Sequence, residues 1–162
     1  MKNESEQDGF SLIELLIVVT LIGIISAIAV PNMLASRRAA NEGSAISSLR
    51  TIFSGQSTYV VTGGAGEYGT LANLGANDFI DQALTNGSKS GYTFSCPAGN
   101  LSAGPPPTFF TTASPSDTGF ATRTGNRSFT VAEDGVLRGK SSDTGPANHT
   151  AAVNSVTWPA IN

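Results

Sequence analysis

The stretch that decides the fold lies close to the start of the chain, where residues 9–32 read GFSLIELLIVVTLIGIISAIAVPN. A continuous helix from Phe10 to Val30 would be about 32 Å long, which is enough to cross the hydrocarbon core of a bilayer. The stretch contains one charged side chain, Glu14. An ionised carboxylate costs roughly 2.5 to 3.5 kcal/mol at the middle of a bilayer and less near its edge, so such a group is usually retained because it has a partner. The stretch therefore predicts a membrane-spanning helix whose carboxylate has a function.

The junction between Gly9 and Phe10 indicates how Glu14 could obtain a partner. Residues 1–9 form a short polar segment that ends abruptly where the apolar stretch begins. Such a boundary is typical of a processing site. Cleavage after Gly9 would make Phe10 the N-terminus, with an α-amine whose unperturbed pKa is about 7.7 to 8.0. This cation would lie one helical turn from Glu14, or close to the Glu14 of a neighbouring copy.

The sequence Gly9-Phe10-Ser11-Leu12-Ile13-Glu14, followed by an apolar helix with Gly23 and Pro31, resembles the N-terminal signature of the type IV pilin superfamily, which includes the type II secretion pseudopilins. The resemblance implies that a prepilin peptidase cleaves between Gly9 and Phe10 and methylates the Phe10 amine. It also implies that Glu14 pairs with the N-terminus of an adjacent subunit as each copy leaves the membrane and joins a helical filament.

The same resemblance implies where the chain resides and what it meets. The precursor is expected in the bacterial inner membrane, where an assembly platform receives it, and the mature chain in an extracellular or periplasmic filament, a pilus or pseudopilus. The leader, residues 1–9, differs from the basic leaders usual in this superfamily, since it contains one basic residue, Lys2, and three acidic residues, Glu4, Glu6 and Asp8. Arg37 and Arg38, beyond the far end of the apolar stretch, favour the opposite orientation on a count of basic residues. We expect the C-terminal part outside the cytoplasm because of the resemblance.

Two other interpretations of the N-terminal segment compete with this one. Ala27-Ile28-Ala29 has the small-residue pattern of a secretory signal cleavage site, and the mature chain would then begin at Val30. Against it, the preceding apolar stretch is longer than the usual length of about 7 to 15 residues and contains an acid. The segment could also be a plain membrane anchor in which Glu14 has no partner.

Beyond Pro31 the helix is expected to continue to about Val61. Residues 32–62 contain no proline and one glycine, and apolar side chains recur at spacings of three, four and seven on one face, at Ile46, Leu49, Phe53 and Val60. This amphipathic half should cover a sheet and end at Thr62-Gly63-Gly64, where a glycine can adopt the left-handed cap. Pro31 removes one backbone hydrogen bond, so we expect the helix to bend there, with Gly23 as a second weak point.

The remaining chain predicts a small sheet domain. Residues 63–90 resemble the pilin αβ-loop, with a short helix from about Asp78 to Leu84 and Asn77 as its N-cap. From residue 91 to 138 short runs of β-forming residues predict three or four antiparallel strands, with a hairpin at Asp134-Gly135. The runs are 91–96, 109–112, 120–123, 128–131 and 136–138. Residues 139–162 should form an irregular tail held by Trp158. The expected fold is α+β, a long bent N-terminal helix packed on a three- to four-stranded antiparallel sheet, as in pilins.

Little in the chain indicates catalysis or a cofactor. His149 is the only histidine, lies in a Pro/Asn/Thr-rich stretch and has no accompanying nucleophile motif, so we expect a solvated loop residue. Asp134 and Asp143 are weak candidates for a Ca²⁺ site, but the EF-hand pattern is absent. Cys96 is the only cysteine, which excludes an intrachain disulfide and predicts a buried side chain in a strand. The full chain has a net charge of −3, of which residues 1–9 contribute −2; the remaining −1 is a near balance that argues against nucleic acid as the main partner.

These observations predict a non-enzymatic structural subunit. It would be processed, would polymerise with itself or with minor pilins through the Phe10–Val30 helix, and would use Glu14 to fix its axial register. Three function classes stay open at this point. They are a pilus-like filament for adhesion, motility or DNA uptake, a pseudopilin of type II protein secretion, and an anchored or secreted domain that does not polymerise.

Overall fold

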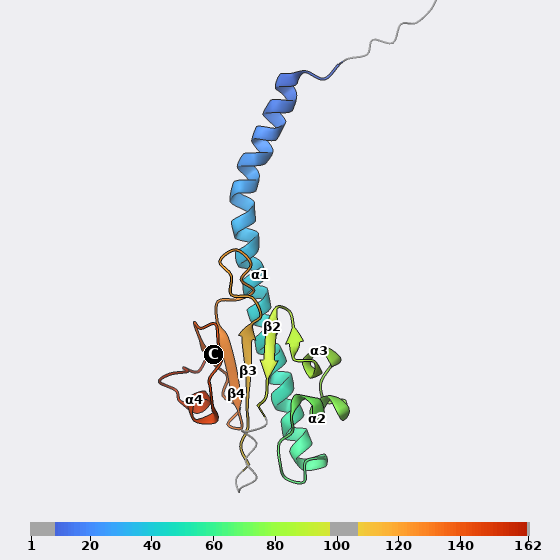
Figure 1. Ribbon diagram of the computed structural model, residues 1–162, viewed down its shortest axis with the longest axis vertical. Coiled ribbons are helices and arrows are strands. Elements are labelled where there is room, and N and C mark those ends of the chain that lie inside the picture. The colour runs from blue at the N-terminus through green and yellow to red at the C-terminus, as the bar shows by residue number, and fades with distance from the viewer. Residues whose placement is uncertain (1–8, 98–106, 162) are drawn as a thin grey trace, which may run out of the picture. The chain divides into compact units, whose positions relative to one another are not determined.

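The computed structural model describes residues 9–97 and 107–161, and the chain forms two compact units, residues 1–36 and 37–162. Helix α1 (Leu12–Thr62) begins in the first unit and ends in the second (Figure 1). It starts where the Ser11 carbonyl accepts hydrogen bonds from the amides of Glu14 and Leu15. It ends at Thr62, as predicted, but Gly63 and Gly64 do not adopt the left-handed conformation. The positive φ values fall later, at Ala65 (50°) and Gly66 (93°), where the Gly66 amide donates to the Val60 carbonyl.

The second unit contains a five-stranded antiparallel sheet in which each strand pairs with the next along the chain. Its strands are β1 (Ser88–Lys89), β2 (Tyr92–Ser95), β3 (Phe110–Pro115), β4 (Ser128–Ala132) and β5 (Arg138–Lys140). The predicted antiparallel sheet is therefore confirmed, with one or two strands more than expected. Residues 120–123, which we expected to be a strand, form a turn instead, and β5 begins at Arg138 rather than at Val136.

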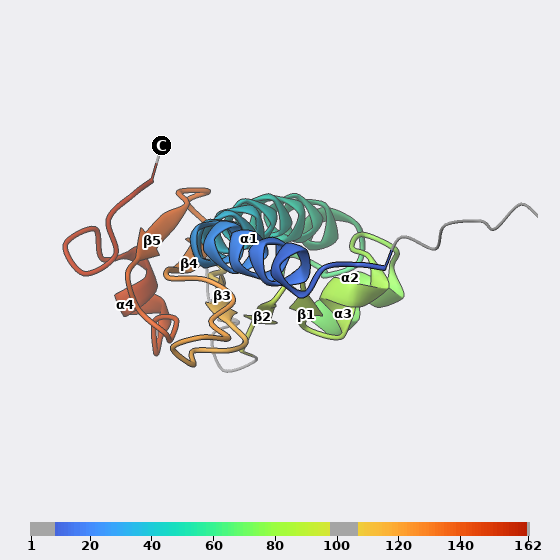
Figure 2. The same ribbon diagram turned by 90° about the horizontal axis from the view of Figure 1, so that it is seen from above.

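The two faces of the sheet carry different partners. Alternate side chains of β4, Phe129 and Val131, belong to the main core together with Leu49 and Ile52 of α1. Ala132, which points to the opposite face, packs with Phe110 and with Ala152 of the short helix α4 (His149–Val153). Viewed from above, the second half of α1 lies over one face of the sheet and α4 lies beside β4 and β5 (Figure 2). The pleat of β4 thus separates a large core under α1 from a small one under α4.

The buried face of α1 differs from the predicted one by part of a turn. Its buried residues are Ala45, Ser48, Leu49, Ile52, Gly55 and Gln56. Of the four residues predicted for this face, Leu49 is fully buried, while Ile46, Phe53 and Val60 are half-buried. The prediction was wrong because it placed the buried face under the large apolar side chains. In the structure, small and polar residues form much of the contact between α1 and the rest of the second unit.

The segment after α1 contains two short helices rather than one. They are α2 (Leu71–Ala76) and α3 (Gln82–Thr85). The side chain of Thr70 caps the first by accepting from the Asn73 amide, and that of Asp81 caps the second by accepting from the Leu84 amide. Asn77, the predicted N-cap, is instead the C-cap of α2.

The last residues are more regular than expected. Asn148 accepts a hydrogen bond from the Ala151 amide and so caps α4. Trp158 is buried, as expected, and the backbone after it bonds to the β5 region, where Gly139 N donates to Pro159 O and Ile161 N to Leu137 O. The predicted irregular tail is therefore a short helix followed by a segment attached to the sheet edge.

Candidate membrane and assembly segment

The first half of α1 is apolar, and no other described residue of the chain covers it. Among the described residues α1 is the one helix that is long and apolar enough to cross a membrane, and none of its most apolar window is buried. Sixteen large apolar side chains between Phe10 and Leu34 are exposed. Fully burying one such side chain contributes roughly 1.5 to 3 kcal/mol. The segment therefore requires lipid or other protein around it.

The Gly9–Phe10 bond lies just before this helix, and both residues are exposed. Phe10 is 82% exposed. No atom approaches within 4 Å of the position that a Cβ on Gly9 would take. In the described part of the chain the bond is therefore sterically open to an enzyme.

Glu14 occupies the third position of α1 and is exposed. A carboxylate in the first turn is stabilised by the helix macrodipole, typically by about 0.3 to 1 kcal/mol. Ser11 and Glu14 also have the Ser-x-x-Glu spacing of a capping box, a signal that the sequence interpretation missed. Glu14 thus has a favourable place at the helix start even before any partner reaches it.

Gly23 and Pro31 both lie inside continuous helix. α1 is helical from Leu12 through Pro31 to Thr62, and no atom of the described residues lies within 4 Å of a Cβ built on Gly23. The Thr20 hydroxyl donates a hydrogen bond to the Leu16 carbonyl at 2.7 Å, so this polar group is satisfied within the helix. A role for Gly23 and Pro31 in bending stays a prediction.

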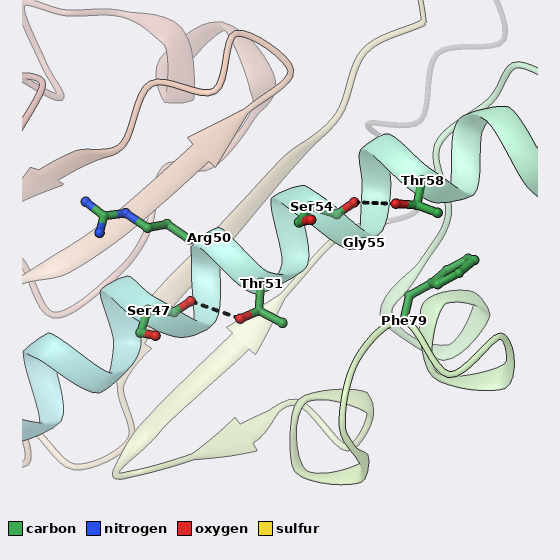
Figure 3. Close-up of a pocket in the computed structure, with 7 residues that line it drawn as sticks. All are labelled: Ser47, Arg50, Thr51, Ser54, Gly55, Thr58 and Phe79. Carbon is green, nitrogen blue, oxygen red and sulfur yellow. Dashed lines mark hydrogen bonds between the residues drawn. The ribbon is translucent and has the colours of Figure 1, made fainter.

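A shallow groove lies on the exposed side of the second half of α1, next to the segment between α2 and α3 (Figure 3). It is lined by Ser47, Arg50, Thr51, Ser54, Gly55, Thr58 and Phe79. Two hydroxyls are occupied within the helix, since Thr51 donates to the Ser47 carbonyl and Thr58 to the Ser54 carbonyl. The lining residues include no carboxylate, imidazole or thiol, so the groove offers no acid, base or activated nucleophile.

The two candidate calcium ligands are engaged in separate ion pairs. Asp134 accepts from both terminal nitrogens of Arg138, at 3.2 and 2.5 Å, and Asp143 accepts from Arg123 at 2.6 Å. Burial opposes ionisation of Asp134, but hydrogen bonds from Arg138 and from the Val136 amide outweigh it and lower the pKa. Among the described residues no three His, Cys, Asp or Glu side chains lie close enough together to hold a metal ion.

His149 is not the solvated loop residue that we expected. It is the first residue of α4 and half-buried, and its Nε2 lies 2.8 Å from both carboxylate oxygens of Glu133. Glu133 also accepts from the Phe109 amide at 3.3 Å. The contact between His149 and Glu133 joins α4 to the turn after β4, so a structural role accounts for both side chains.

Cys96 lies beside a buried amide that links α1 to the segment before α2. Gln56, fully buried on α1, donates to the Gly69 carbonyl at 2.5 Å and accepts from the Gly69 amide at 2.9 Å. Cys96 Sγ lies 3.6 Å from Gln56 Nε2. Burial raises the pKa of the Cys96 thiol, so the thiol stays protonated at neutral pH and makes a poor nucleophile.

A second unforeseen contact joins the start of the second unit to the loop between β3 and β4. Arg38, Asn41 and Glu42 all bond to the backbone of residues 120–126. These partners are 82 to 85 residues apart in the chain, so no local sequence signal could have revealed them.

Comparison with known proteins identifies a known motif in the segment that contains the Gly9–Phe10 bond and the apolar first half of α1. Residues 5–30 match the family model described as the prokaryotic N-terminal methylation motif. The chain is similar to the type IV major pilin protein PilA of Myxococcus xanthus, with 34% identity over 92 residues, which are 57% of this chain and 39% of that protein. It is also similar to the type IV wide pilus major component PilA4 of Thermus thermophilus, with 56% identity over 34 residues, or 21% of this chain and 26% of that protein.

The alignments thus span well under half of each curated relative. No solved structure matches the chain significantly. The methylation motif and these relatives support the expected relationship to the type IV pilin superfamily. The fold, a long N-terminal helix on an antiparallel sheet, is close to the pilin fold.

Proposed function

We propose that the chain is the precursor of a structural, non-enzymatic subunit of a type IV pilus-like filament. The observation that carries the proposal is the uncovered apolar half of α1, headed by Gly9-Phe10 and by Glu14 in its first turn. In the membrane, lipid surrounds the sixteen exposed apolar side chains; after extraction, only the same helices of neighbouring copies offer a comparable apolar surface.

The proposed pathway has three steps. The apolar first half of α1 inserts into the inner membrane, a prepilin peptidase cleaves after Gly9 and methylates the Phe10 amine, and the assembly platform passes the mature chain into the filament. Both relatives are named as major components of type IV pili, which favours a pilus over a type II secretion pseudopilus. Imaging of sheared surface fibres with an antibody to residues 37–162 tests this choice.

Glu14 is proposed to set the axial register of the filament. An apolar helix could slide past its neighbours with little penalty, but a carboxylate buried without the Phe10 amine of the adjacent copy is costly, so most wrong offsets are disfavoured. Its favourable position near the helix N-terminus keeps the charge tolerable until this partner arrives.

The cleavage is tested by the mass of the mature N-terminus. We expect a chain that begins with N-methylated Phe10. A mature chain beginning at Val30 would instead support a secretory signal, and an intact Met1 would support a plain anchor; either result would contradict the proposed processing.

The register role is tested by Glu14→Ala and Glu14→Gln. Both variants should insert into the membrane and be processed, yet yield few or no filaments, because neither carries the negative charge that pairs with the amine. Thr20→Ala is the matched control, since it also removes a polar group from the apolar half of α1 and should assemble normally. Normal filaments from Glu14→Gln would show that charge pairing does not fix the register.

A further inference from the structure

The loop between β3 and β4, residues 116–127, presents a fully exposed aromatic side chain. Phe120 has a relative exposure of 101%. The turn around it is well bonded, because the Asp117 carboxylate accepts from the Gly119 amide at 2.8 Å and from the Thr122 hydroxyl at 2.9 Å, and the Arg123 amide donates to the Gly119 carbonyl. Phe120 is therefore held out from an ordered turn.

The same loop is fastened to the start of the second unit. Arg38 donates from Nε to the Arg123 carbonyl at 3.2 Å and from Nη2 to the Phe120 carbonyl at 3.5 Å. Asn41 adds a bond to the Thr124 carbonyl at 2.9 Å. The backbone of Phe120 is thus fixed next to Arg38 of α1.

Arg38 lies close in the chain to the end of the apolar segment. Leu34 is the last exposed large apolar residue of that segment, and Arg37 and Arg38 follow it within one helical turn. Four helical residues correspond to about 6 Å, which is comparable with the thickness of one headgroup layer. If Leu34 marks the edge of the hydrocarbon, Arg38 reaches the level of the lipid phosphates.

The charged side chains around Phe120 suit a contact with lipid phosphates. Within the described part of the chain, Arg37 and Arg38 form no ion pair, whereas Arg123 pairs with Asp143. The nearby carboxylates are occupied by the loop, since Asp117 bonds within the turn and Glu42 accepts from the Asn126 amide. Among the described residues, the Arg37 guanidinium and the Nη1 group of Arg38, which the loop carbonyls leave free, can thus donate to phosphate oxygens beside an exposed aromatic ring.

We propose that the β3–β4 loop is a second membrane contact of the unassembled subunit, in which Phe120 enters the headgroup–acyl boundary of a phospholipid bilayer and Arg37 and Arg38 bind lipid phosphates. This contact rests on the membrane stage of the proposed function and goes beyond it. It would hold the second unit against the membrane until the subunit is extracted.

Fluorescence of the full chain in vesicles with brominated acyl chains tests the contact. Phe120→Trp should show a blue-shifted emission that bromolipid strongly quenches, after subtraction of the signal from the buried Trp158 of the parent. Val61→Trp is the matched control, because Val61 is also exposed (82%) but lies one residue before the far end of α1, so bromolipid should leave it unquenched. An unquenched, red-shifted tryptophan at position 120 would overturn the proposal.

Two further variants separate the causes of each result. Ile22→Trp reports on insertion of α1 itself; if it is quenched and position 120 is not, the loop contact is wrong while the membrane stage stands. If position 22 is unquenched as well, the membrane stage fails and the loop contact with it. Arg37→Gln should weaken the quenching at position 120, whereas Arg50→Gln, at another exposed arginine of α1, should not.

A second copy of the chain is the competing occupant of this surface. Loss of filaments in Phe120→Ala, together with an unquenched tryptophan at position 120 in vesicles, would assign the loop to contact between subunits and overturn the lipid contact. Normal processing after Gly9 in these variants would keep the proposed function intact in either case.

Discussion

At the scale of single residues, Gln56 shows how one buried side chain ties two segments together. It sits on the buried face of α1 and satisfies both the amide and the carbonyl of Gly69. Buried backbone groups need such partners, because an unpaired one costs about 1 to 3 kcal/mol. The link fixes the segment that leads into α2 against the main core.

Replacing Gln56 should therefore destabilise the second unit. We expect Gln56→Ala to lower the free energy of unfolding by about 2 to 4 kcal/mol, since it leaves two buried groups unpaired and a small cavity. Denaturant unfolding of the full chain in detergent measures the loss. Thr58→Ala, on the exposed side of the same helix, should change stability by less than about 0.5 kcal/mol. Equal effects of the two substitutions would contradict this role for Gln56.

The ion pair of Asp134 with Arg138 predicts a dependence of stability on pH. Arg138 is buried, so its guanidinium relies on the Asp134 carboxylate. The pKa of Asp134 is lowered in the folded chain, against the opposing effect of burial, by its hydrogen bonds from Arg138 and the Val136 amide. Its contribution is thus complete above the unfolded pKa of about 3.9 and is lost as the pH falls through the folded value.

Asp134→Asn should accordingly destabilise the chain at neutral pH by about 1 to 3 kcal/mol, below the usual cost for a buried pair because Asp134 is partly open to solvent. The difference between parent and variant should shrink as the pH approaches and passes below the folded pKa. Thermal unfolding from neutral to acidic pH tests both statements. Asp143→Asn, in an exposed pair, is the control and should cost no more than about 1 kcal/mol. A pH-independent difference for Asp134→Asn would contradict the pairing.

At the scale of elements, the hairpin between β1 and β2 depends on two residues with positive φ. Ser90 (50°) and Gly91 (71°) form the whole loop between Lys89 and Tyr92. Two successive positive φ values are the mark of a type I′ turn, whose twist matches that of the paired strands and which prefers Asn followed by Gly. Ser90 is therefore not the best residue for its position.

Ser90→Asn should stabilise the chain, by about 0.5 kcal/mol, because asparagine tolerates the left-handed region better than serine. Gly91→Ala should destabilise it by roughly 1 to 2 kcal/mol. A Cβ on Gly91 would also lie 2.9 Å from Thr124 Cβ. Denaturant midpoints of the two variants measure these opposite shifts. Stabilisation by Gly91→Ala would show that the turn is of another type.

The elements that the sequence predicted well are those with strong local signals. α1 was predictable because its apolar half and its end at Thr62 are both marked in the sequence, and the turn at Asp134-Gly135 because Gly135 supplies the positive φ (70°) that this turn requires. The N-terminal motif is likewise linear and matches the methylation-motif model over residues 5–30, while the individual roles of Gly9, Phe10 and Glu14 stay predictions.

The elements that the sequence did not predict depend on contacts between distant residues. β1 has two residues and is defined by its partner strand rather than by its own composition. Residues 120–123 have β-forming side chains, but the Asp117 carboxylate bends the preceding backbone into a turn that Arg38 then holds. His149 acquires its place only when Glu133 is brought to it by the fold. None of these arrangements has a periodicity that a sequence interpretation could detect.

At the scale of the whole molecule, the two units differ in what they need for stability. The buried residues of α1 begin at Ala45, and the main core lies wholly within residues 37–162. The first unit has no buried apolar residue among those described, so its helix depends on lipid or on neighbouring copies. Folding of the second unit should therefore not depend on the first.

A fragment of residues 37–162 should accordingly be a soluble monomer that unfolds cooperatively. Size exclusion with light scattering should show one copy, and circular dichroism should show helix and sheet that melt in a single transition. Leu49→Ala in the same fragment should cost about 2 to 5 kcal/mol, because the Leu49 side chain of α1 is fully buried in the main core, and a loss of this size would show that the fragment retains that core. The full chain should need detergent or lipid to remain dispersed. A fragment that aggregates, or whose stability Leu49→Ala leaves unchanged, would show that the apolar half of α1 contributes to the fold itself and not only to membrane insertion and assembly.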